Sequence, residues 1–296
     1  MGKTAYLDTA NWYDLVEGNA PFTCLESAIV RDQITLVLSF VHLLEFGRRT
    51  QPYRDRVTEF IDTVASHGRL LWLRDEKTVA RAEMQQALMK WMGLCSPPTT
   101  VFFTRFADAY TTPNASLEMV AEKTNSVSQI MENLCDLPRY RTFITKRRKI
   151  DTFQGFSRLR EAYQESGRLP VPKAFESVKN FLADVPKVIR TPAGIEIKVT
   201  AGMRAEFLNA LKWEEIPSIR LRVSAMVGWS MTSGGERSSD IEDLFHLVAI
   251  AYCDKAFADK RTIDALLKGR AYKLPAPNSE FVSWLEGINE KNEIDY

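Results

Sequence analysis

The feature that most constrains the fold is the segment of residues 239–260, SDIEDLFHLVAIAYCDKAFADK, which sets acidic residues around an apolar run. Asp240 and Asp243 stand three residues apart, so on a helix they project from one face near its start. Apolar residues at helical spacing follow, and residues 255–258 then form a short strand-like run that ends at Asp259. The segment therefore predicts a helix that begins with two acids and a strand that ends with one.

Two short apolar runs near the N-terminus resemble that strand. Residues 4–7 end at Asp8, and residues 34–38 end at Ser39, which stands six residues before Glu45. In an open parallel sheet the loops that follow the strands line a crevice at their carboxyl ends. We therefore expect Asp8 and Glu45 to meet the acids of the C-terminal segment at one edge of a sheet.

The segments between these runs favour an α/β fold. Residues 11–17 and 53–68 have helical patterns, and residues 70–73 form a third strand-like run. Parallel strands cannot be joined by a tight turn, so this alternation is typical of a parallel sheet with crossover helices on its faces.

Four carboxylates are the candidate catalytic and metal-binding groups: Asp8, Glu45, Asp243 and Asp259, with Asp240 as a substitute or helper ligand for Asp243. Acids brought so close would repel one another, and a divalent cation removes the conflict. Because the expected ligands are oxygen atoms only, Mg²⁺ or Mn²⁺ is favoured over zinc. A metal held there could lower the pKa of a bound water and orient it towards a phosphorus, so the site would need no covalent nucleophile.

Each acid also has a structural explanation. Asp8 and Asp240 are both positioned to cap the helices that follow them, and Glu45 has Arg48 and Arg49 as helical neighbours for a surface ion pair. Only the combination of several acids at strand ends favours the metal site over these alternatives.

Two further polar residues, His246 and Asp254, lie close to these acids in the sequence. His246 follows Asp243 by three residues and could orient an acid or contact a substrate, although a histidine on such a helix is more often structural. Asp254 begins the strand that Asp259 follows, so it should lie at the opposite edge of the sheet. A Ser-His-Asp hydrolase is disfavoured because the chain has no Gly-x-Ser-x-Gly motif.

Charge is unevenly distributed along the 296 residues. The formal net charge is only +1, yet residues 139–190 contain thirteen Lys or Arg and five Asp or Glu. A basic region beside an acidic remainder suits a protein that grips phosphates in one part and holds metal in another. The densest basic run, in which aromatic residues are interleaved, is the candidate nucleic-acid contact, although a solvated helix face would have the same composition; its members are Arg139, Arg141, Lys146, Arg147, Arg148 and Lys149.

Other classes of protein are disfavoured by composition. The four cysteines are widely spaced without a Cys-x-x-Cys pair, and the chain has only three histidines, so neither a zinc cage nor a disulfide framework is indicated. No run of eighteen apolar residues occurs and no secretory leader is recognisable. We therefore expect a soluble, cytoplasmic protein without a membrane partner.

The order of these features resembles the PIN-like domain ribonucleases: a strand then Asp8, a strand then Ser39 and Glu45, an acidic helix start, and a strand then Asp259. The resemblance implies a PIN-like parallel sheet flanked by helices and a metal-dependent endoribonuclease that uses Mg²⁺ or Mn²⁺ and acts on RNA. The chain departs from the family in one respect, because Asp240 and Asp243 compete for a position that usually holds one acid. A non-catalytic RNA-binding or scaffold protein and a DNA-directed nuclease of the same architecture are the alternatives.

The resemblance covers the two ends of the chain. Residues 1–74 and 237–296 are assigned to the nuclease core, and residues 75–236 to a large, mainly helical insertion that is basic from 139 to 190. Within the insertion, residues 79–92 have a helical pattern, and residues 188–199 have the pattern of a hairpin, with Pro and Gly at its turn.

Overall fold

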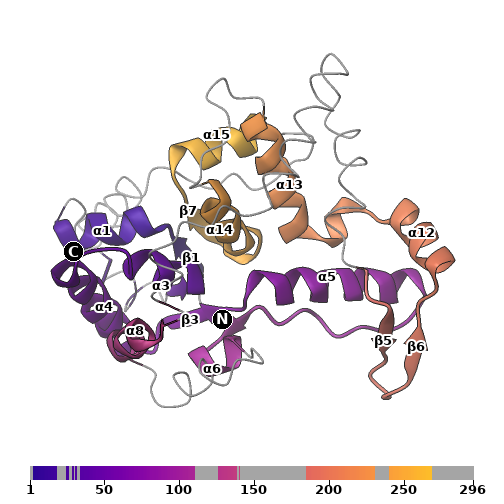
Figure 1. Ribbon diagram of the computed structural model, residues 1–296, viewed down its shortest axis with the longest axis horizontal. Helices are drawn as coiled ribbons and strands as arrows, with labels where there is room; N and C mark the ends of the chain where they lie inside the picture. Colours follow the sequence, from indigo (N-terminus) through magenta and orange to yellow (C-terminus); the bar gives the residue numbers. More distant parts are fainter. Residues whose placement is uncertain are drawn as a thin grey trace.

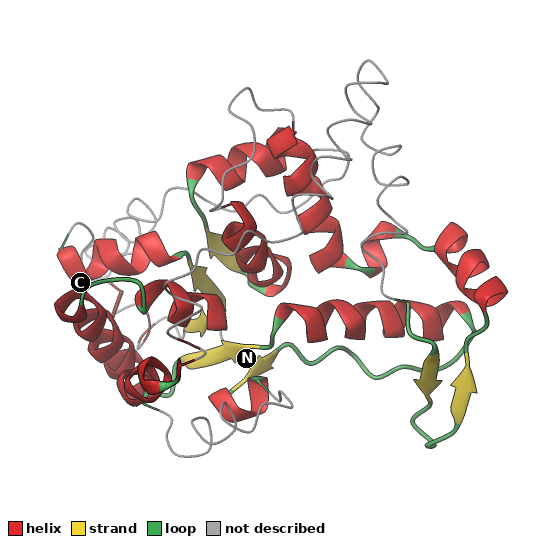
Figure 2. Ribbon diagram, in the orientation of Figure 1, coloured by secondary structure: helices red, strands yellow, loops and turns green. Residues whose placement is uncertain are grey.

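A computed structural model of the protein describes residues 3–18, 25–26, 29, 31, 34–110, 126–138, 140, 185–230 and 240–268. Across these residues the chain is an α/β protein, in which a mixed sheet of five strands is flanked by helices (Figure 1). Figure 2 shows the short strands of this sheet in the interior, with helices around them. The coarse fold class predicted from the sequence is confirmed.

The sheet is mostly parallel. Its order is β4-β3-β2-β1-β7, and β1 (Thr4–Leu7), β2 (Thr35–Leu38), β3 (Leu70–Leu73) and β7 (Lys255–Phe257) run in one direction. These are the four strands that the apolar runs predict. At one edge β4 (Phe102–Phe103) pairs antiparallel with β3, which the sequence pattern did not predict.

Strand residues alternate between two apolar cores because successive side chains point to opposite faces of a sheet. Tyr6 and Val37 belong to one core, whereas Leu7 and Leu36 belong to the other. Burial on both faces explains why these strands are nearly continuous apolar runs rather than alternating ones.

The helices divide between the same two cores. The core on the face of Tyr6 includes residues of α5 (Glu76–Trp91), α13 (Pro217–Ser230), α14 (Asp240–Tyr252) and α15 (Lys260–Lys268). The core on the face of Leu7 includes residues of α1 (Thr9–Glu17), α3 (Phe40–Phe46), α4 (Gln51–Ser66), α6 (Phe106–Ala109) and α8 (Val127–Asp136). In Figure 1 the two sets of helices lie on different sides of the strands.

Helices α13 and α15 approach each other at Gly228. A Cβ atom built on Gly228 would lie 1.9 Å from the carbonyl oxygen of Ala265. No side chain fits at that separation, so the packing of these two helices depends on a residue without one.

The described part of the expected insertion is mainly helical. It contains α5, α12 (Ala201–Ala210), the 3-10 turn η1 (Trp213–Glu215) and α13, and the predicted hairpin is formed by β5 (Val188–Arg190) and β6 (Glu196–Lys198). However, β4 extends the sheet and α13 packs against α14 and α15, so parts of residues 75–236 join the central cores. The boundaries of core and insertion therefore stay a prediction.

The basic run from Arg139 to Lys149 lies outside the described residues, apart from Tyr140. Residues 231–239 and everything after Lys268 also lie outside them. The nucleic-acid contacts assigned to Arg139, Arg141 and Lys146–Lys149 thus remain predictions from the sequence.

Candidate metal centre

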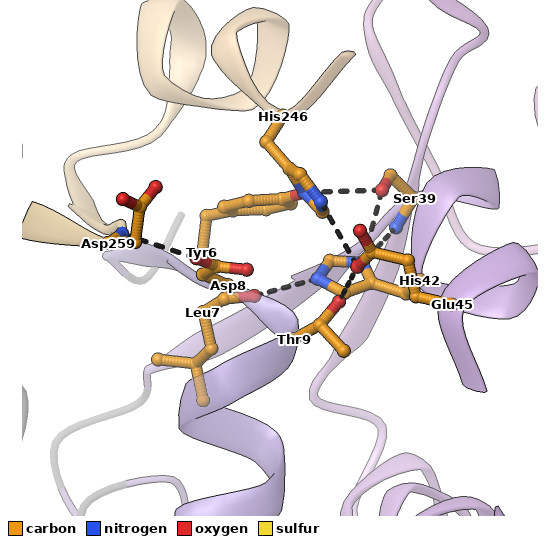
Figure 3. A network of polar contacts seen from close by, with 9 residues as sticks. All are labelled: Tyr6, Leu7, Asp8, Thr9, Ser39, His42, Glu45, His246 and Asp259. Carbon is orange, nitrogen blue, oxygen red and sulfur yellow. Dashed lines mark hydrogen bonds and ion pairs between the residues drawn. The ribbon is translucent and has the colours of Figure 1, made fainter. Parts of the chain in front are cut away.

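The candidate site lies at the carboxyl edge of the parallel strands. Asp8 follows β1, Ser39 follows β2, and Asp259 stands two residues beyond the end of β7. The pairing of β1 with both β2 and β7 places these three positions along one edge. The backbone N–H of Asp259 donates a hydrogen bond to Oδ2 of Asp8 at 3.2 Å, which joins two of them directly (Figure 3).

Asp8 occupies the capping position at the start of α1 but does not cap the helix. Its backbone is extended, and its side chain makes no capping hydrogen bond, although a hydrogen bond from the backbone of Thr9 favours the carboxylate form. Burial raises the pKa of its carboxyl group; His246 opposes this change, and the charges of Glu45 and Asp259 add to it. The structural explanation for Asp8 is thus wrong, and its carboxylate lies instead among other acids.

Glu45 on α3 points into the interior, with only 18% of its side chain exposed. Its Oε2 accepts hydrogen bonds from the hydroxyl of Thr9 and, at 3.3 Å, from Nε2 of His246. Burial disfavours the carboxylate, but the charge and hydrogen bond of His246 and the bond from Thr9 outweigh it and lower the pKa of Glu45 to about 2. Glu45 therefore carries a negative charge at neutral pH.

His246 on α14 completes the closest group of potential ligands. Asp8, Glu45 and His246 each offer one ligand atom, and these atoms lie within 4.8 Å of one another. Burial alone would lower the pKa of His246, yet the charge and hydrogen bond of Glu45, with Asp8 and Asp243, raise it to about 9. Without a metal, a protonated His246 thus serves as the counter-charge for the acids.

The orientation of His246 is fixed from behind by Tyr6. The Tyr6 hydroxyl contacts Nδ1 of His246 and lies 3.1 Å from Oγ of Ser39, and both contacts are buried. The ring of His246 can therefore present only Nε2 to Glu45, because its other nitrogen is already bound.

The same chain of hydrogen bonds continues to His42. Nε2 of His42 donates to the carbonyl oxygen of Leu7 at 2.7 Å, and its Nδ1 accepts from the backbone N–H of Ser39 at 3.0 Å. Burial, together with the charge of His246, lowers the pKa of His42 to about 3. His42 is thus a neutral residue that ties the end of β1 to the start of α3.

Asp243 and Asp259 border the group of three without belonging to it. Burial, then the charge of Asp259, raises the pKa of Asp243 to about 8, and Asp8 and Glu45 contribute to the same effect. Oδ1 of Asp259 accepts hydrogen bonds from the backbone N–H groups of Arg261 (2.8 Å) and Thr262 (3.1 Å), so Asp259 also caps α15. Helix α14 begins at Asp240, whose side chain lies outside the description.

The closest group thus differs from the expected set of oxygen ligands. It contains the imidazole of His246, for which the sequence pattern of the helix alone predicts a structural role. In the sequence, Tyr6 and Thr9 carry no signal beyond strand and helix formation, and Ser39 is marked only by its position at the end of a strand. Asp254 lies at the amino edge as expected, where its Oδ2 accepts a hydrogen bond from the backbone N–H of Thr4 at 2.8 Å.

No family model matches the chain, and no curated protein or solved structure matches it either. Among the described residues, no helix has the length and apolar character needed to cross a membrane.

Proposed function

We propose that the protein is a metal-dependent endoribonuclease with a PIN-like core. The observation that carries this proposal is the convergence of Asp8, Glu45 and His246 within 4.8 Å, with Asp243 and Asp259 alongside, at the carboxyl edge of a parallel sheet. These residues come from both ends of the chain, in the order on which the resemblance to PIN-like ribonucleases rests.

The electrostatics of the group fit a divalent cation. The pKa values of Asp8 and Asp243 are raised, which means that the folded protein disfavours their charged forms. The imidazolium ion of His246 is one positive charge among the acidic groups Asp8, Glu45, Asp243 and Asp259. A cation bound by Asp8 and Glu45 would stabilise the charged forms of both side chains. The unfavourable charge of the metal-free group therefore supports a metal site.

The donor set narrows the choice of metal. Asp8 and Glu45 supply oxygen atoms, and Nε2 of His246 supplies a nitrogen atom once it loses its proton. Carboxylates suit both Mg²⁺ and Mn²⁺, whereas a nitrogen donor favours ions of the first transition row. Of the two metals expected from the sequence, Mn²⁺ therefore fits this set better.

The residues of the chain would bind the metal, and their neighbours would hold the ligand side chains in position. A divalent cation supplies Lewis-acid chemistry, because it activates water and neutralises charge that develops on a phosphate. Asp8 and Glu45 hold the negative side of the site, the N–H of Asp259 fixes one oxygen of Asp8, and Tyr6 fixes the ring of His246. With water as the nucleophile, no side chain has to form a covalent intermediate.

The test is an assay of RNA cleavage by the parent protein and by Asp8→Asn and Glu45→Gln, each with Mn²⁺, Mg²⁺ or a chelator. Asp264→Asn is the matched control, because it makes the same chemical change at an exposed position on α15. We expect metal-dependent cleavage by the parent and the control, and a loss of at least about a hundredfold in the two site variants.

Three outcomes would overturn the proposal. Full activity of Asp8→Asn would show that the acids are not needed for cleavage. RNA binding without cleavage under every metal condition would favour a non-catalytic RNA-binding or scaffold protein. Metal-dependent cleavage of DNA but not of RNA would support the metal site but show that the protein is a DNA-directed nuclease.

A further inference from the structure

A groove of about 720 Å³ lies at the other end of the molecule, between the β5–β6 hairpin and the first turn of α12. We call it the hairpin groove. The charged residues that line it are Lys187, Lys198, Arg204 and Glu196. Three cations and one anion thus surround a cavity large enough for a group the size of a nucleotide.

The single acid of the hairpin groove is already neutralised. Glu196 forms an ion pair with Arg190, its cross-strand neighbour on the hairpin. Within the described chain, Lys187, Lys198 and Arg204 make no ion pair, and Nε of Arg204 is buried without a hydrogen-bond partner. The positive charge of the groove therefore has no internal partner in this part of the structure.

The fold fixes the backbone positions from which these cations extend. Ile189 on β5 is buried in the core that also contains α5 and α13, so the opposite face of the hairpin is turned outward. On that outward face Lys198 pairs in register with Val188, which is 51% exposed. Two strands and a capped helix thus set the spacing of the charges, unlike lysines scattered over a mobile surface.

Helix α5 runs from the central sheet towards the end of the molecule that carries the hairpin groove (Figure 1). This helix begins soon after β3 at the sheet and ends beside α12, where the rings of Trp91 and Phe207 lie 5.9 Å apart (Figure 1). A helix of 16 residues is about 24 Å long. An RNA strand that reached from one end of α5 to the other would therefore span several nucleotides.

We infer that the hairpin groove binds the phosphate backbone of a single-stranded RNA at a distance from the site of cleavage. This inference rests on the proposed nuclease function for the identity of the polyanion. It extends the predicted basic contact region beyond Arg190 to Lys198 and Arg204, which no charge run in the sequence marks.

The experiment measures RNA affinity of the uncleaving Asp8→Asn protein as a function of salt. The test variant adds Lys187→Gln and Lys198→Gln, both at exposed positions, so that folding is preserved. The matched control adds Lys255→Gln and Lys268→Gln, which remove the same two charges from exposed positions outside the groove.

We expect the groove variant to bind long single-stranded RNA about tenfold more weakly. Its plot of log K against log salt concentration should also become shallower by about 0.7 for each lost phosphate contact. The control pair should change neither quantity. In the cleaving background, the groove variant should act normally on a dinucleotide, which reaches only one site, and poorly on long RNA.

Equal affinity and equal salt dependence in the groove variant and the control would overturn the inference. So would weaker binding of polyglutamate with unchanged binding of RNA, because the groove would then take an acidic polypeptide. Failure of the nuclease proposal is distinguishable: RNA would still bind through Lys187 and Lys198, but no metal would support its cleavage.

Discussion

Glu45 and His246 are 201 residues apart in the chain, and their side chains meet through a contact of 3.3 Å between Oε2 and Nε2. This contact joins α3, which follows β2, to α14, which precedes β7. It lowers the pKa of the acid and raises the pKa of the histidine, so the pair is charged at neutral pH when no metal is bound.

Tyr6→Phe should weaken the binding of Mn²⁺ about 10- to 100-fold, because the ring of His246 loses the hydroxyl that fixes its Nδ1. Isothermal titration calorimetry would measure the change. Tyr252→Phe is the matched control, since its hydroxyl bonds to Glu83 and not to the candidate centre. Equal losses of affinity in both variants would mean that Tyr6 supports the fold and not the orientation of His246.

Asp8→Asn should stabilise the protein in a chelator and destabilise it relative to the parent in saturating Mn²⁺. In the metal-free protein the substitution removes a buried charge, and with it the repulsion from Glu45 and Asp259, a gain on the order of 1 kcal/mol. With metal, the parent gains about 2.7 kcal/mol at a hundred times Kd, and the variant loses most of that gain.

Urea denaturation under both conditions would show this crossover. Asp264→Asn should follow the parent in each condition, because its carboxylate is exposed on α15. If Asp8→Asn is instead less stable than the parent in the chelator, Asp8 stabilises the metal-free fold through its hydrogen bond to Asp259. This result would contradict the prediction that its buried charge is destabilising.

The buried His42 should make stability depend on pH. Its pKa is lowered to about 3, so the folded protein keeps it neutral while the unfolded chain takes up a proton below about pH 6.5. The unfolded state then binds more protons, and stability falls as the pH drops from about 6.5 towards 3. His42→Gln lacks this pH-dependent contribution, so only the parent loses stability through it as the pH falls. The difference in free energy of unfolding between parent and variant should therefore shrink by about 2 kcal/mol from about pH 7 to about pH 5.

Urea denaturation of both proteins across this range would measure the narrowing. His67→Gln is the control, because His67 is partly exposed beside Glu26 and takes no part in the bonds around Ser39. A deficit of His42→Gln that stays constant with pH would show that His42 does not resist protonation in the folded state.

Gly228→Ala should destabilise the protein by about 3 kcal/mol or more, because its Cβ atom would overlap the carbonyl oxygen of Ala265 and push α13 away from α15. Gly202→Ala, in α12, is the control: nothing lies within 4 Å of its Cβ position, so its stability should be unchanged or slightly higher. Thermal unfolding of both variants tests the helix contact, and equal melting temperatures would contradict it.

The sequence predicted the framework of the site well. Short apolar runs that end in Asp8, Ser39 and Asp259 became parallel strands with a common carboxyl edge, because runs buried on both faces have few other structures open to them. The hairpin was equally predictable, because Pro and Gly mark its turn in the sequence. In the structure Gly194 adopts a positive φ of 80° there, a conformation that favours glycine. These features depend on local pattern alone.

Features that depend on distant contacts were not predictable. β4 has two residues, too few for any periodicity to appear. Tyr6 has the pattern of an ordinary strand residue, and only the folded chain brings its hydroxyl to His246 and Ser39. For the same reason the helix pattern around His246 favoured a structural role, because the pattern carries no information about Glu45 on another helix.

Anomalous scattering from a crystal of the protein soaked in Mn²⁺ would show directly whether Asp8, Glu45 and His246 hold a metal ion. We expect a peak within about 2.5 Å of a carboxylate oxygen of Asp8, a carboxylate oxygen of Glu45 and Nε2 of His246. Well-ordered side chains at these positions with no peak between them, or a peak bound only by other residues, would contradict this expectation.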